Sequence, residues 1–200
     1  MTNPQPPTPH TFTSLYDHLL TTYPTPLLPS PSARPHDPTL TDPIASLTLH
    51  PTLEALLHLL NADLTSAHFL CRHMQNRPAW EGMYIHGLLH RIEGDYRNAE
   101  AWYSDVADSD VFKRCWPEGG LEAAKCFIRC VERLRKEGVG ERERLEEESR
   151  REIEGLVGWC EERFGTEKWE DATKVWVKDS EEVREMKAGM VVGGEGWRQF

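Results

Sequence analysis

Two histidines and a carboxylate fall on one face of a predicted helix. His86 and His90 are four residues apart and Glu93 follows three residues later, which places all three on the same side of a helix. Imidazole and carboxylate groups together can hold a divalent metal ion, and they can also act as an acid–base pair. Asp63 and His68 lie one predicted hairpin earlier and can approach this face. The residue types therefore predict a metal or proton-transfer site formed by Asp63, His68, His86, His90 and Glu93.

The same residues also fit a purely structural role. Gly87 stands where the zinc-protease pattern HExxH has its glutamate. His58 occupies the position of His90 in an internal repeat, which is typical of a recurrent packing role. Glu93 falls at the end of a predicted helix, where a carboxylate is unfavourable unless it is paired. If the role is structural, each ring nitrogen of His86 and His90 should have a protein partner, since an unpaired buried polar group is costly.

The residues that position these side chains form a predicted pair of helices over 80–106. Gly94 suits the left-handed backbone that ends a helix, and Asp95 can cap the helix that follows. A shift of 32 residues places Ala62 on Gly94 and Asp63 on Asp95, so that a helix break and a cap coincide. This repeat predicts two stacked antiparallel helical hairpins, with Gly87 at the closest approach of two helices.

The pattern of small and aromatic residues resembles that of tetratricopeptide repeats. The resemblance rests on Gly87, Gly94, Tyr96, Ala99 and Tyr103. It implies an all-α fold without a sheet, built from about 7–9 helices that stack as hairpins.

Residues 84–103 resemble a second motif, found in uncharacterised helical proteins of bacteria and fungi and written roughly as YWHxxxHRxEGDxxNAxYW. Ile85 stands where that motif has tryptophan, and the order of Trp102 and the following tyrosine is reversed. This resemblance implies a common site around His86 and His90 without naming its chemistry.

Stacked helical hairpins offer a concave face that suits a peptide or a partner helix. We expect this face to carry Trp80, Tyr84, Arg91, Asn98 and Trp102. The main hypothesis is thus a protein-binding or peptide-binding scaffold, with a small-molecule ligand as a variant. The alternatives are a metalloprotein or enzyme that uses His86 and His90, and a subunit that only stabilises an assembly. No cofactor other than a divalent metal is indicated.

Composition narrows the class of partner. The net charge of −10 repels phosphate backbones and argues against a nucleic-acid partner. No stretch is long and apolar enough for a membrane span, and no signal peptide is evident. The five cysteines are scattered, which is typical of reduced thiols in a cytoplasmic protein, with a nuclear location as the alternative.

The sequence divides into five predicted segments. Residues 1–9 are expected to be disordered, and 10–23 to form a helix that docks on the body. Residues 24–46 are rich in proline and predict an extended linker. Residues 47–179 predict the helical-hairpin domain, and 180–200 a last helix with a frayed end.

Overall fold

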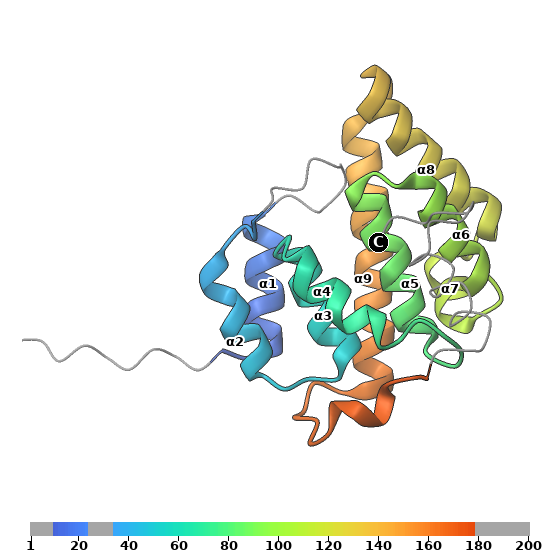
Figure 1. Ribbon diagram of the computed structural model, residues 1–200. Helices are drawn as coiled ribbons and strands as arrows, with labels where there is room; N and C mark the ends of the chain where they lie inside the picture. Colours follow the sequence, from blue (N-terminus) through green and yellow to red (C-terminus); the bar gives the residue numbers. More distant parts are fainter. Residues whose placement is uncertain (1–9, 24–33, 179–200) are drawn as a thin grey trace, which may run out of the picture.

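The computed structural model describes residues 10–23 and 34–178, and this part of the chain is all-helical (Figure 1). It contains nine α-helices, two short 3₁₀ helices and no strand, which confirms the predicted all-α class without a sheet. Each of these helices is too short or too polar to span a lipid bilayer. The elements are α1 (Phe12–Thr22), η1 (Pro38–Leu40), α2 (Thr41–Ser46), α3 (Pro51–Leu60), α4 (Leu64–Arg72), α5 (Trp80–Glu93), α6 (Tyr96–Val106), α7 (Asp110–Cys115), α8 (Gly120–Glu137), α9 (Arg142–Phe164) and η2 (Ala172–Val175).

Two pairs of helices carry the predicted repeat. α3 packs against α4, and α5 packs against α6. Between the helices of each pair the backbone turns through a left-handed conformation, with φ of 55° at Ala62 and 89° at Gly94. The carboxylates of Asp63 and Asp95 then cap α4 and α6, each accepting a hydrogen bond of 3.2 Å from the backbone N–H three residues on. The predicted breaks and caps are therefore confirmed, whereas the likeness to tetratricopeptide stacking stays a prediction.

Gly87 lies where α5 and α6 approach most closely. A Cβ atom at this position would stand 2.8 Å from Cδ1 of Tyr103 and 3.0 Å from Cβ of Trp102. Real Cβ atoms essentially never approach a neighbouring side chain as closely as the first of these distances. The predicted close helix crossing at Gly87 is confirmed.

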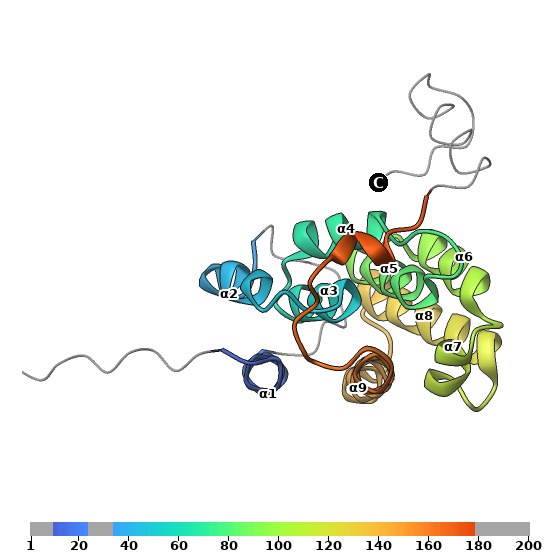
Figure 2. The same cartoon turned by 90° about the horizontal axis from the view of Figure 1, so that it is seen from below.

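The long helix α9 runs along one side of the molecule, next to α1. Figure 2 looks along both helices and shows them end-on. α9 contacts α3, α7 and α8, and the guanidinium of Arg150 donates a hydrogen bond of 3.3 Å to the backbone oxygen of Leu20 in α1. α1 buries Phe12, Leu15 and Leu19 against the core, so the predicted docking helix of residues 10–23 is confirmed.

The predicted linker of residues 24–46 is wrong in its described part, 34–46. Instead of an extended chain, this part forms η1 and α2, and Ile44 is buried in the core. The prolines are compatible with helix because Pro38 and Pro43 occupy first-turn positions, where a backbone N–H has no helical partner to lose. Asn61 anchors the segment by accepting two backbone hydrogen bonds, one from His36 at 2.7 Å and one from Asp37 at 2.9 Å.

Three further predictions fall partly or wholly outside the described residues. These are the disordered start at 1–9, the first half of the linker at 24–33, and the C-terminal helix or tail at 180–200. The predicted domain of 47–179 spans α3 to η2, of which residue 179 is not described.

Candidate functional site

Four of the five predicted site residues come together between α4 and α5. We call His68, His86, His90 and Glu93 the histidine cluster. Because a carboxylate can only accept, Nε2 of His68 donates to Oε1 of Glu93 at 2.8 Å. Nδ1 of His90 lies 3.4 Å from Oε2 of the same carboxylate. The amide of Asn98, on α6, lies 3.1 Å from Nε2 of His90, so both ring nitrogens of His90 have a partner.

His86 is fully buried and has no hydrogen-bond partner at either ring nitrogen among the described residues. Its ring stacks between those of His90 and Trp102, with centroid distances of 4.8 Å and 4.5 Å. Burial, reinforced by the neighbouring histidines, lowers the pKa of His86 well below its ordinary value of 6.5. His86 is therefore a neutral packing group, and it departs from the expectation that a structural histidine has a partner at both nitrogens.

The geometry of the histidine cluster does not provide a metal site. Within residues 10–23 and 34–178, no three His, Cys, Asp or Glu side chains are placed to hold a metal ion. The rings of His86 and His90 lie nearly parallel, at an interplanar angle of 17°, so their in-plane lone pairs do not converge on a point between them. The nitrogens of His68 and His90 nearest to Glu93 already contact its carboxylate.

The carboxylate of Glu93 is what joins α4 to α5 in the histidine cluster. Burial alone would raise its pKa, but the hydrogen bonds from His68 and His90 lower it to about 2. Glu93 is thus ionised at neutral pH and holds two imidazoles from neighbouring helices.

Asp63, the fifth predicted site residue, does not join the histidine cluster. Its carboxylate caps α4 and also accepts a hydrogen bond of 3.0 Å from the hydroxyl of Thr41. Nδ1 of His58 lies 3.2 Å from the same carboxylate. The capping geometry fixes Asp63 toward α2 and α3, and the sequence prediction that placed it beside His68 is wrong.

Four of the five residues predicted on an exposed binding face are buried inside the molecule. Tyr84 and Arg91 are fully buried, and Asn98 and Trp102 are nearly so. Tyr84 and Arg91 are bonded to Glu152 of α9. Asn98 and Trp102 instead contact His90 and His86 of the histidine cluster, and the sequence does not reveal either set of contacts. Only Trp80 stays partly exposed, with the guanidinium of Arg77 at 4.7 Å from its ring centre.

A buried carboxylate that was not predicted from the sequence, that of Glu152, joins α9 to α5 and α6. Oε1 of Glu152, on α9, accepts hydrogen bonds from the hydroxyls of Tyr84 and Tyr103, both at 2.7 Å, and from Nε1 of Trp116 at 3.1 Å. Its other oxygen pairs with Arg91 at 2.8 Å. Burial, together with the negative charge of Glu152, raises the pKa of both tyrosines well above 10.0, so they remain hydrogen-bond donors.

One signal in the sequence could have identified Glu152. It follows Ser149 by three residues and precedes Leu156 by four, on the face of α9 that also carries Ile153 and Cys160. A lone carboxylate on an apolar helix face is rarely left without a buried partner. Because α9 contains many exposed charged residues, the buried Glu152 does not stand out from them in the sequence.

A row of aromatic rings lies on the surface where α4 ends. We call Phe69, His73 and Trp176 the aromatic row. The rings of Phe69 and His73 meet edge to face at 5.0 Å, and His73 stacks on Trp176 at 4.2 Å. Phe69 is 58% exposed and Trp176 is 40% exposed, which is high for large apolar side chains. The backbone N–H of Val177 donates to the backbone oxygen of His73 at 2.9 Å and holds the two segments together.

Trp176 also lines a pocket of 370 Å³, which we call the C-terminal pocket. Its walls come from the start of α3, the α4–α5 connection, the end of α9 and residues 174–178. The ring of His50 stacks flat on Phe164 at 3.6 Å, and burial followed by the charge of Arg163 lowers the pKa of His50 to about 4. At neutral pH this wall is uncharged and largely apolar. The aromatic row and the pocket form one continuous surface through Trp176.

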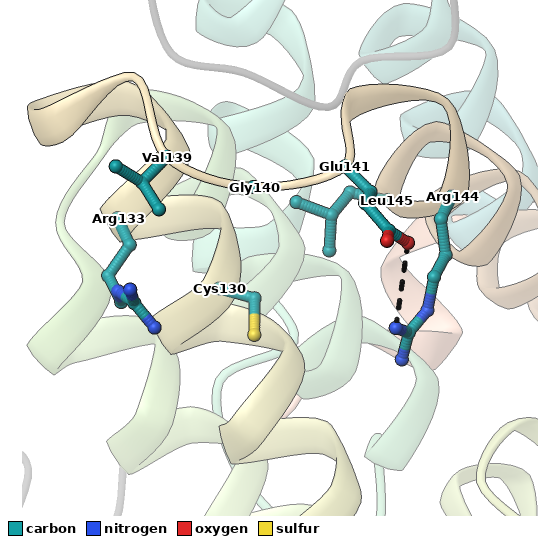
Figure 3. Close-up of a pocket in the computed structure, with 7 residues that line it drawn as sticks. All are labelled: Cys130, Arg133, Val139, Gly140, Glu141, Arg144 and Leu145. Carbon is teal, nitrogen blue, oxygen red and sulfur yellow. Dashed lines mark ion pairs between the residues drawn. The ribbon is translucent and has the colours of Figure 1, made fainter.

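A smaller pocket of 220 Å³ lies under the turn between α8 and α9 (Figure 3). Figure 3 shows Arg144 paired with Glu141 at its edge, at 3.8 Å. Cys130 and Leu145 also line it, and Val139 is 50% exposed beside it. No exposed aromatic ring borders this pocket, which makes it a useful contrast to the C-terminal pocket.

Comparisons with known proteins give no match to the chain among protein-family models, curated proteins or solved structures. The function is therefore argued from the geometry of the described residues.

Proposed function

We propose that this protein is a helical module that binds a peptide segment of another protein. The observation that carries the proposal is the aromatic row, Phe69, His73 and Trp176, which continues without a break into the C-terminal pocket. The proposal keeps the class of function expected from the sequence and moves the site away from the predicted face, four of whose five residues are buried.

The energetics of protein interfaces support this assignment. Aromatic side chains are enriched in binding surfaces because they bury a large area and lose little conformational entropy. Phe69 and Trp176 expose apolar area that a folded chain normally buries, and their rings are held in place by contact with His73. A partner that covers these rings would gain the free energy of apolar burial without first ordering them.

Hydrogen bonds and ion pairs hold in place the segments that carry the aromatic row. Glu93 links α4, which carries Phe69 and ends just before His73, to α5. Trp169 donates its backbone N–H to the backbone oxygen of Thr48 at 2.8 Å, which fastens the chain leading to Trp176. We assign a supporting role to the histidine cluster on this basis.

A display experiment tests the proposal. Random peptides displayed on phage are selected against the full-length protein, and bound clones are then compared on Phe69→Ala, Trp176→Ala and Val139→Ala. Val139 is a matched control because it is an exposed apolar side chain on the distant α8–α9 turn. We expect the selected peptides to lose binding to the two aromatic variants and to keep it on the control. Failure to select any peptide, or equal binding to all variants, would contradict the proposal.

A further inference from the structure

The charges around the C-terminal pocket are unbalanced. Four charged side chains line it: Glu81, Arg163, Lys174 and Lys178. Glu81 is nearly buried, and its carboxylate accepts a hydrogen bond of 2.8 Å from Nε1 of Trp159 and lies 3.4 Å from Nε of Arg163. The opposite charges of Glu81 and Arg163 therefore offset each other in the pocket lining.

The two lysines remain without such a partner. Within the described residues neither Lys174 nor Lys178 forms an ion pair, although Lys174 also interacts electrostatically with the carboxylate of Asp171, three residues before it. They stand two residues before and two residues after Trp176, and all three side chains line the pocket. The chain as a whole carries a net charge of −10, which makes a positively charged pocket rim a local exception.

We infer that the C-terminal pocket takes an acidic peptide segment, with an apolar or aromatic side chain entering the pocket and flanking carboxylates pairing with Lys174 and Lys178. This inference rests on the proposed function and names the chemistry of its partner. A negatively charged segment is repelled by most of the acidic surface and attracted to this rim, which favours correct placement.

The size of the pocket agrees with this occupant. Ligand pockets span roughly 300–1,000 Å³, and the C-terminal pocket of 370 Å³ lies at the small end of that range. Such a volume suits one or two side chains of a peptide better than a large cofactor. The neutral ring of His50, stacked on Phe164, gives the entering side chain an uncharged wall.

Two synthetic fluorescent peptides test the charge preference directly. One carries glutamates on both sides of a central phenylalanine, and the other carries lysines instead. Binding to the full-length protein is measured by fluorescence anisotropy at low and at high salt. We expect the acidic peptide to bind more tightly, and we expect salt to weaken its binding because exposed charges are screened.

A charge-reversed variant locates the contact. Lys174→Glu/Lys178→Glu should weaken binding of the acidic peptide about tenfold or more, which corresponds to about 1.4 kcal/mol. Lys113→Glu/Lys125→Glu changes the net charge by the same amount on α7 and α8, away from the pocket, and should bind nearly as the wild type does. Thermal melting of both variants checks that they fold.

The outcomes separate this inference from the proposed function. Equal binding of acidic and basic peptides, or an unchanged affinity in Lys174→Glu/Lys178→Glu, would overturn the acidic partner. If peptides selected from the random library still bind through Trp176, the proposed function survives that result. If no peptide of any charge binds, both fail.

Discussion

Arg91 on α5 and Glu152 on α9 form an ion pair of 2.8 Å in which both side chains are fully buried. Two charges are removed from water here, and the cost is offset only because nearly every polar atom around them is paired. Two tyrosine hydroxyls and the indole N–H of Trp116 complete the contacts of Glu152. The ion pair holds α9 against α5 and α6. It therefore buries Tyr84 and Arg91, which the sequence predicts to be exposed.

Removing the charge of Glu152 should destabilise the fold strongly. Glu152→Gln keeps the shape and leaves the guanidinium of Arg91 buried without a counter-charge, which costs about 3–5 kcal/mol. The measurement is the free energy of unfolding in urea. Glu162→Gln is the control, because its pair with Arg114 is exposed, and it should leave stability nearly unchanged.

The double variant Arg91→Met/Glu152→Gln isolates the ionic part of this effect. It removes both charges and keeps an oxygen that can accept from the tyrosines. We expect it to be more stable than Glu152→Gln alone. A Glu152→Gln protein that unfolds at the same urea concentration as the wild type would contradict the structural account of α9.

Gly87→Ala should lower the free energy of unfolding by about 1–3 kcal/mol through overpacking. The added methyl group would press on Tyr103, which cannot easily yield because its hydroxyl is bonded to Glu152. Gly158→Ala is the matched control on α9, where the nearest atom to a new Cβ is a flexible Arg114 nitrogen at 3.8 Å. The control should match or exceed the wild type, since alanine favours helix over glycine. Equal melting temperatures of all three proteins would argue against the close crossing.

His86 should make stability depend on pH below its unfolded pKa of 6.5. The folded state keeps this ring neutral because burial lowers its pKa, whereas the unfolded chain binds a proton. The stability that His86 contributes is thus complete above pH 6.5 and is lost as the pH falls from there toward its folded pKa.

The contribution of His86 is the difference between the pH-dependent loss of stability of the wild type and that of a His86 variant. At pH 5, 1.5 units below the unfolded pKa of 6.5, one such histidine accounts for at most about 2 kcal/mol. Urea unfolding of the wild type and of His86→Gln at pH 7.5 and pH 5 should show a smaller loss in the variant, because other buried histidines such as His58 contribute equally to both proteins. An identical loss in both proteins would mean that His86 is protonated in the fold.

The features that the sequence predicted correctly are local ones. Gly94 and Asp95 end one helix and start the next through contacts that span only a few residues, and their residue types determine the conformation. The grouping of His86, His90 and Glu93 follows from helical spacing, and His68 joins them because α4 packs against α5.

The features that the sequence could not predict depend on distant partners. Every residue of α5 from Glu81 to Ile92 is buried, and periodicity does not reveal which elements cover it, so Tyr84 and Arg91 could be mistaken for exposed residues. The stacking of Trp176 on His73 joins positions more than a hundred residues apart in a segment without clear periodicity. Asp63 was misplaced because its capping bonds hold it away from the histidine cluster.

The aromatic row and the C-terminal pocket together are the proposed binding surface. Amide chemical shifts of the uniformly ¹⁵N-labelled full-length protein, recorded while the acidic phenylalanine peptide is added, test this directly. We expect the largest changes on Phe69, His73 and residues 174–178. Changes centred on His86 and Trp102, or on the α8–α9 turn around Val139, would contradict it.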